Sequence, residues 1–152
     1  MIRSLWPSEE TRGDRIIEQM LFNSPFKTSN YDKNYTVFLP DGAARWYVNL
    51  GTTVFGDCMS FSNCILIDNQ HFKLNKSDVV LFRNTITQLP FQRHEDQIFI
   101  YYTLESPQHT NIGEDFAINW TASYRLDSDI VTPYGKYVDL TDNNELRSRY
   151  GP

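Results

Sequence analysis

The sequence predicts an α/β fold built on an open, largely parallel β-sheet, as in one half of a doubly wound fold. Short continuous apolar runs recur along the chain, and such runs are typical of strands that are buried on both faces of a parallel sheet. The composition, with 40% hydrophobic and 22% charged residues among 152, is that of a folded domain with a core of its own.

The predicted strands begin at residue 35. Residues 35–39 and 45–50 are rich in aromatic and β-branched side chains, and a Pro-Asp-Gly turn signal at 40–42 separates them. Further apolar segments predict strands at 64–67, 78–82 and 97–104, of which the last is the strongest. We expect a helix within 116–124 that leads into a strand at 130–132.

Residues 1–34 read as a polar stem or linker, in which apolar spacing predicts one short helix at 14–22. No apolar run approaches the roughly 20 residues that cross a bilayer, and the first residues lack the apolar region of a signal peptide. We therefore expect neither a membrane anchor nor a signal within this chain.

Charge and ligand chemistry argue against two classes of partner. The net charge is −5 and the basic residues are not clustered, so we expect no nucleic-acid partner. The three histidines are scattered, and Cys58 and Cys64 have no further cysteine at metal-ligand spacing, so we expect no metal site. The two cysteines could close a small disulfide loop or remain reduced.

Three Asn-x-Ser/Thr triplets are candidate N-glycosylation sites. They begin at Asn34, Asn75 and Asn119.

Glu105 directly follows the strongest predicted strand. In open parallel sheets the chemistry lies just beyond the carboxyl ends of the strands. A carboxylate at such a position is expected to be partly desolvated, which makes it a stronger proton acceptor near neutral pH. A solvated loop residue or a partner of an arginine is the alternative role for Glu105.

Other polar residues near Glu105 have both functional and structural interpretations. His109 could contact Glu105 or a sugar hydroxyl, or simply lie on the surface. Tyr134, between Pro133 and Gly135, could stack on a sugar ring or pack against the domain. The Asp-Ser-Asp sequence at 127–129 resembles a metal–diphosphate box, but a turn before the strand at 130 is the favoured interpretation.

Four sequence elements follow one another between residues 102 and 137. They are L-E-S-P at 104–107, N-W-T at 119–121, Y-R-L-D-S-D-I at 124–130 and P-Y-G at 133–135. In order and spacing they resemble the signature of the α1,3/1,4-fucosyltransferases, glycosyltransferase family ten. The similarity extends upstream through the cysteines and the segment 65–82, and covers about residues 45–138. Leu126 stands where the family usually has a second arginine.

The resemblance implies a GT-B-type enzyme with two Rossmann-like domains that transfers L-fucose from GDP-fucose to an N-acetylglucosamine hydroxyl of a glycan, with inversion. Residues 35–140 would be the acceptor-side N-terminal domain, followed by a divergent tail at 141–152. A second domain would hold GDP-fucose, so we expect no cofactor on this one.

The resemblance also assigns roles to single residues. Glu105 matches the glutamate that serves as the family's presumed catalytic base, and Asn119 matches a position that often carries an N-glycan. Arg125, in the Y-R-L-D-S-D-I element, joins His109 and Tyr134 as a candidate for binding the acceptor. Family members bond their N-terminal cysteines to a distal C-x-x-C, and they are lumenal Golgi proteins with a membrane anchor.

Two functions remain open at this point. The chain could be the N-terminal domain of a protein-glycosylating fucosyltransferase, or a glycan-binding module or pseudo-enzyme without transfer activity. In both cases we expect residues 1–152 alone to be inactive, because no donor-domain motif occurs among them.

Overall fold

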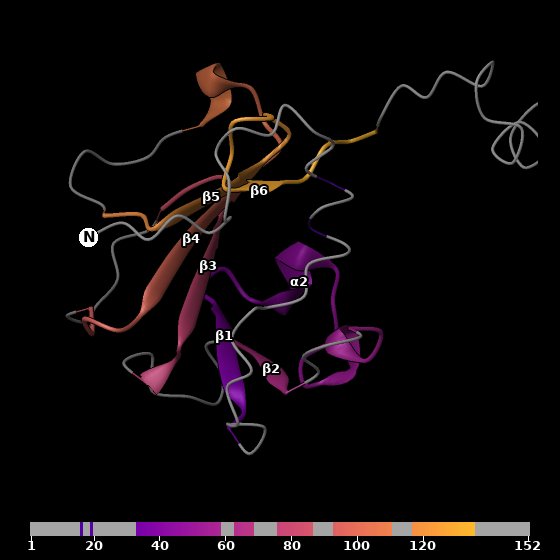
Figure 1. The fold of residues 1–152 in the computed structure, drawn as a ribbon, viewed down its shortest axis with the longest axis vertical. Coiled ribbons are helices and arrows are strands. Elements are labelled where there is room, and N and C mark those ends of the chain that lie inside the picture. The colour runs from indigo at the N-terminus through magenta and orange to yellow at the C-terminus, as the bar shows by residue number, and fades with distance from the viewer. Residues whose placement is uncertain are drawn as a thin grey trace, which may run out of the picture.

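The computed structural model of the protein describes residues 16, 19, 33–58, 63–68, 76–86, 93–110 and 117–135. They form a six-stranded sheet with the strand order β2-β1-β3-β4-β5-β6, in which every pair of neighbours is parallel (Figure 1). The strands are β1 (Tyr35–Leu39), β2 (Cys64–Asp68), β3 (Val79–Arg83), β4 (Ile98–Thr103), β5 (Trp120–Ser123) and β6 (Ile130–Val131).

The strand order identifies the type of sheet. The chain places β2 on one side of β1 and then adds β3 to β6 on the other side. This is the order of the flavodoxin-like doubly wound sheet, whose direction of winding reverses between β1 and β3. The predicted open parallel α/β sheet is therefore confirmed. We call the edge where the strands end the carboxyl edge, and the opposite one the amino edge.

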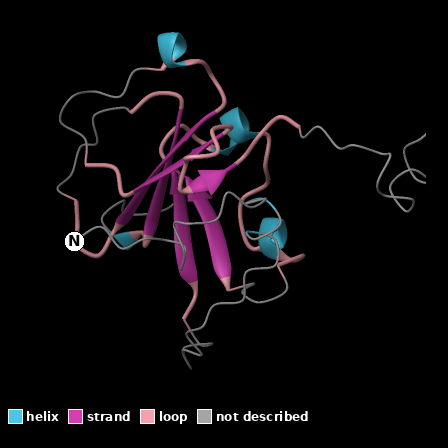
Figure 2. Ribbon diagram, turned by 45° about the horizontal axis from the view of Figure 1, so that its top comes forward, coloured by secondary structure: helices cyan, strands magenta, loops and turns pink. Residues whose placement is uncertain are grey.

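The described helices are short and lie at the periphery of the sheet (Figure 2). They are α2 (Ala43–Trp46), η1 (Thr53–Phe55) and η3 (Pro107–His109). None of the helices in the described ranges is long and apolar enough to cross a membrane.

The prediction of a strand at 45–50 is wrong. After β1, the N–H of Gly42 donates to the carbonyl of Leu39 at 3.1 Å, which forms the predicted turn at 40–42. The carboxylate of Asp68, at the end of β2, then accepts the N–H of Ala43 at 3.2 Å. This contact holds the chain in the helical turn α2, and Tyr47 ends it in the left-handed conformation with φ 55°.

The prediction of a helix within 116–124 is also wrong, because residues 120–123 form β5. Their spacing suits a helix, but pairing with the preceding strand β4 satisfies their backbone groups in the sheet. The other predicted strands, and the strand after residue 130, are confirmed with shifts of a residue or two at their ends.

Most of the predicted stem, the tail at 141–152 and the predicted helix at 14–22 lie outside the described residues. Of that helix, Ile16 and Gln19 are described and are helical. The Gln19 side-chain amide exchanges hydrogen bonds of 2.9 and 2.6 Å with the backbone of Val131. It thereby caps backbone groups of β6, the last strand of the sheet.

The core lies on both faces of the sheet. Phe38, Val80, Phe82, Phe99 and Tyr101 form the larger buried cluster. Alternate strand residues point the other way, where Leu39 of β1 and Leu66 of β2 form a second cluster with Ala43 of α2. Burial on both faces explains why the strands read as continuous apolar runs.

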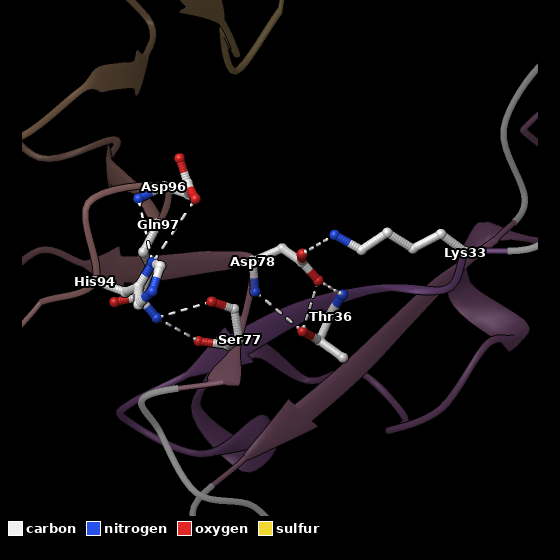
Figure 3. Close-up of polar contacts among 7 residues, drawn as sticks. All are labelled: Lys33, Thr36, Ser77, Asp78, His94, Asp96 and Gln97. Carbon is white, nitrogen blue, oxygen red and sulfur yellow. Dashed lines mark hydrogen bonds and ion pairs between the residues drawn. The ribbon is translucent and has the colours of Figure 1, made fainter. Parts of the chain in front are cut away.

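Polar clasps hold the amino edge together (Figure 3). The N–H and hydroxyl of Thr36, on β1, donate to the carboxylate of Asp78, just before β3, at 2.8 and 2.9 Å. Lys33 pairs with the same carboxylate at 2.7 Å. Nearby, the buried Gln97 amide donates to the carbonyl and hydroxyl of Ser77 at 2.9 and 2.8 Å. These bonds join the beginnings of β1, β3 and β4.

The same Thr–Asp clasp occurs again at the far end of the sheet. The N–H and hydroxyl of Thr121, on β5, donate to the carboxylate of Asp129, just before β6, at 2.7 and 2.9 Å. Each clasp links the second residue of one strand to the residue that precedes the neighbouring strand.

Replacing Asp78 with Asn should lower the free energy of unfolding by roughly 1–2 kcal/mol near neutral pH, because a charge-assisted acceptor is lost. Burial alone would raise the pKa of Asp78, but the hydrogen bonds from Lys33 and Thr36 outweigh it and hold the pKa below its ordinary value. The depressed pKa contributes stability above the unfolded value of about 3.9, and this is lost as the pH falls through the folded pKa.

Urea unfolding over a pH series measures this difference. The difference in the free energy of unfolding between the native chain and Asp78→Asn should be largest near pH 7 and should shrink in acid. Asp96→Asn is the control, since the Asp96 side chain on the same edge is 92% exposed. A difference that stays unchanged in acid would contradict the depressed pKa of Asp78.

Candidate functional site

The carboxyl edge carries a cavity of about 270 Å³ between the ends of β4 and β5. Parallel pairing brings the two ends together, since Thr103 lies opposite Ser123 in the register. The lining residues all carry hydroxyl or charged groups, but most of the surface that they turn to the cavity is apolar; they include Tyr101, Thr103, Glu105, Ser123, Arg125 and Asp127. Such a set of donors and acceptors suits a polyhydroxylated ligand.

Glu105 lies two residues beyond β4, as predicted, and lines this cavity. Its backbone N–H donates to the hydroxyl of Thr103 at 3.1 Å, which fixes the start of the loop. Within the described part of the chain its carboxylate has no ion pair or hydrogen bond, so none of the described arginines is its partner. The side chain is exposed. The described residues therefore do not supply the expected partial desolvation, which stays a prediction.

Arg125 also lines the cavity. Its guanidinium donates to both carboxylate oxygens of Asp127, at 2.7 and 2.5 Å. This hydrogen-bonded pair raises the pKa of Arg125 and fixes its orientation. The N–H of Ser128 donates to the carbonyl of Arg125 at 3.2 Å, so the favoured turn before β6 is confirmed. Asp127 and Asp129 both have partners within the fold, as a turn requires.

Tyr134 lies beside the Glu105 loop. Its hydroxyl donates to the carbonyl of Leu104 at 3.0 Å, and the residue is otherwise 77% exposed. Tyr134 therefore supports the residue next to Glu105 and still offers a free ring face. His109 ends η3, is exposed and does not line the cavity. Glu105 and Arg125 thus line the same cavity, whereas Tyr134 contacts the start of the Glu105 loop and, like His109, is not part of the lining.

Sequence reasoning missed the hydroxyl-bearing wall of the cavity. Tyr101 is buried, and its hydroxyl donates to the carbonyl of Asn84 at 2.9 Å. Burial raises the pKa of Tyr101, so the phenol stays protonated as a donor. Ser123 and Ser128 are also buried and share a hydrogen bond. Only the strand register, which a single sequence does not state, places these residues on one wall.

The candidate glycosylation sites differ in their surroundings. The side-chain oxygen of Asn119 accepts the N–H of Phe99 at 2.8 Å and a bond from Arg93. The amide nitrogen, which is the atom that glycosylation modifies, takes no part in these bonds. Asn34 is exposed just before β1, and Asn75 lies outside the described residues.

Cys58 and Cys64 are free thiols in the structure. The disulfide between them, one of the two states that the sequence left open, is not formed. Burial raises the pKa of Cys64, and the nearby Cys58 adds to this effect. Cys64 is therefore a protonated thiol at neutral pH, with low reactivity.

This chain is similar to known fucosyltransferases and to a family model of their N-terminal domain. The family model described as "Fucosyltransferase, N-terminal" matches residues 20–135. Glycoprotein 3-alpha-L-fucosyltransferase A of Drosophila melanogaster is 33% identical over 140 residues, which cover 88% of this chain and 27% of that protein. Alpha-(1,3)-fucosyltransferase fut-6 of Caenorhabditis elegans is 31% identical over 98 residues, covering 59% of this chain and 25% of that protein. The chain thus spans about a quarter of the length of these curated relatives.

The hydrogen bonds of Asn119 give a test of its structural role. In unglycosylated protein, Asn119→Ala should lower the free energy of unfolding by roughly 1–3 kcal/mol, because it leaves the N–H of Phe99 without its acceptor. Asn119→Asp should lose much less, since a carboxylate can accept the same bonds. Asn34→Ala, in the exposed triplet, is the matched control and should change stability by less than about 0.5 kcal/mol. Equal losses for the Ala and Asp variants, measured by urea unfolding, would refute the role.

Proposed function

The chain belongs to the fucosyltransferase family through its N-terminal domain, and we propose that it is the acceptor-binding part of an enzyme that transfers L-fucose from GDP-fucose to a glycan. Residues 35–140 form this acceptor-side domain in the proposal. The acceptor is an N-acetylglucosamine hydroxyl, and Glu105 is the general base.

The chemistry needs one base on this domain. The Glu105 carboxylate takes the proton of the acceptor hydroxyl while that oxygen forms a bond to the anomeric carbon of fucose. The bond from that carbon to the diphosphate breaks at the same time, and GDP leaves with the electron pair. Attack from the face opposite the leaving group inverts the anomeric centre, so the reaction requires no second carboxylate on this domain.

The observation that carries this proposal is an unpaired carboxylate on a hydroxyl-lined cavity. Glu105 faces about 270 Å³ of space and has no cation to neutralise it in the described part of the chain. The sugar would sit between Glu105 and the Arg125–Asp127 pair, which offers a fixed donor and acceptor to its hydroxyls. Tyr134 would stack on the sugar. His109 would contact a part of a longer acceptor that lies farther from the base.

The rest of the enzyme follows from the family. GDP-fucose would bind to a second domain that faces the carboxyl edge and closes over Glu105, excluding water from a carboxylate that is exposed here. Asn119, Asn34 and Asn75 would carry N-glycans in the Golgi lumen, where an anchor outside residues 1–152 would hold the protein to the membrane. Cys58 and Cys64 would then be available for disulfides to the second domain.

A chimaera tests the role of Glu105. Residues 20–135 of this chain would replace the matching segment of the Drosophila relative, and transfer from GDP-fucose to a glycan with terminal N-acetylglucosamine would be measured. Glu105→Gln should lower kcat by roughly 10²- to 10⁴-fold, since proton transfer by a positioned base contributes about that much. Glu95→Gln, an exposed glutamate on the opposite edge, should keep full activity.

Two results would overturn the proposal. Full transfer by the Glu105→Gln chimaera would remove Glu105 as the base. Glycan binding by a chimaera that never transfers fucose, even with the native Glu105, would favour the binding-module alternative.

The isolated chain provides a second test. Residues 1–152 should transfer no fucose, because orienting both substrates in one cleft supplies much of the rate and the donor would bind to the other domain. Transfer of radiolabelled fucose by the purified chain would show that this division of labour is wrong.

A further inference from the structure

A second cleft opens on the carboxyl edge, separate from the Glu105 cavity. It measures about 340 Å³ and is lined by Arg45, Tyr47, Arg83, Asn84 and Thr85. Both charged residues in this lining are arginines. In a chain of net charge −5, a cleft whose lining carries only positive charge is a distinct electrostatic feature.

The position of this cleft in the sheet is informative. Arg45 follows β1 in α2, while Arg83 ends β3 and Asn84 and Thr85 follow it. The strand order reverses between β1 and β3. In open α/β sheets, ligands bind outside the carboxyl ends of the strands where the order reverses. The cleft therefore occupies the place where this type of sheet usually holds a ligand.

Arg83 is the group that would contact the ligand. Its guanidinium lies over the ring of Trp46, 5.6 Å from the centroid, and Trp46 packs on Tyr102 with their centroids 5.1 Å apart. These rings hold the guanidinium in place. Within the described ranges Arg83 has no carboxylate partner. A partly buried, oriented guanidinium without a counter-ion is suited to a planar oxyanion.

Unlike Arg83, Arg45 has a carboxylate partner among the described residues. It pairs with Asp41 at 3.6 Å, and its side chain is 65% exposed. Asp41 therefore compensates one of the two positive charges and leaves the charge of Arg83 uncompensated. Arg45 lies at the rim of the cleft, where its exposed side chain can meet a ligand while it stays paired with the largely buried Asp41.

Two residues that line the cleft have a left-handed backbone. They are Tyr47 and Asn84, with φ of 55° and 60°. Tyr47 takes this conformation as the residue that ends α2, and asparagine adopts it readily, so the backbone by itself does not mark a binding site. Tyr47 is 91% exposed, so its ring is open to a ligand in the cleft.

We infer that this cleft is a subsite for an oxyanion, a carboxylate or phosphate group, which Arg83 binds through its guanidinium with Arg45 at the rim. Arg83 pairs with Tyr102 of β4, the strand that leads to Glu105, so the cleft and the Glu105 cavity share the carboxyl edge of the sheet. The anion could be the carboxylate of an acidic sugar in the acceptor, or the diphosphate of the sugar nucleotide. That assignment to a substrate rests on the proposed function, whereas anion binding itself does not.

The test is an NMR titration of the 15N-labelled chain at constant ionic strength. The probes are methyl glucuronide, a carboxylate, and sodium pyrophosphate, a diphosphate, with neutral methyl glucoside as the reference. We expect saturable shifts of the Arg83 side-chain N–H and of the Asn84 and Thr85 amides with at least one anion, and none with the glucoside. Saturation by the glucuronide alone identifies the acceptor as the source, and saturation by pyrophosphate alone identifies the donor.

Variants test whether the anion binds at Arg83. Arg83→Gln should weaken it by roughly tenfold or more, and Arg83→Lys, which keeps the charge and packing but loses the fork of donors, should weaken it less. Lys76→Gln, with the same loss of charge on the amino edge, should bind as the native chain does.

Other outcomes would overturn the inference. Shifts that never saturate, or that equal those caused by chloride, mean that Arg83 is a structural cation only. Binding that persists unchanged in Arg83→Gln places the anion elsewhere. Glu105→Gln should bind the anion normally, so a failure of this inference is distinct from a failure of the proposed catalytic role.

Discussion

Parallel pairing of all six strands is the constraint on which the rest of the structure depends. Parallel strands cannot be joined by tight hairpins, so each connection must return from one edge of the sheet to the other. All strand ends therefore meet at one edge and all strand beginnings at the opposite one. Core side chains on both faces fix this register, because a shift by one residue would turn Phe38 and Phe82 out of the larger cluster.

The two edges of the sheet use their polar residues differently. At the amino edge the polar groups satisfy one another, as in the clasps of Thr36 with Asp78 and Thr121 with Asp129. At the carboxyl edge, Glu105 and Arg83 have no partner of opposite charge among the described residues. Unpaired charges contribute little to stability, and their presence along one edge is what a substrate surface requires.

The arrangement along the carboxyl edge suggests how a substrate would lie. The cleft of Arg83 is at the ends of β1 and β3, and the cavity of Glu105 is at the ends of β4 and β5. Their centres are two strand spacings apart, roughly 10 Å across the sheet. Arg83 points to the face opposite Tyr101 and Thr103, because it alternates with Phe82 along β3. A substrate that spans both would place an anion at one site and a hydroxyl at the other. Because Glu105 is exposed, its strength as a base depends on what covers this edge.

The sequence by itself determined the parallel sheet, most strand positions, Glu105 at a strand end and the family, because continuous apolar runs and ordered motifs are local patterns. The tertiary structure decided what residues 45–50 and 120–123 form, since Asp68 holds Ala43 in a helical turn and β4 pairs with β5. It also decided that Glu105 is exposed and that Arg45 and Arg83 share a cleft. These outcomes depend on contacts between residues far apart in the chain, and no local pattern of side chains encodes them.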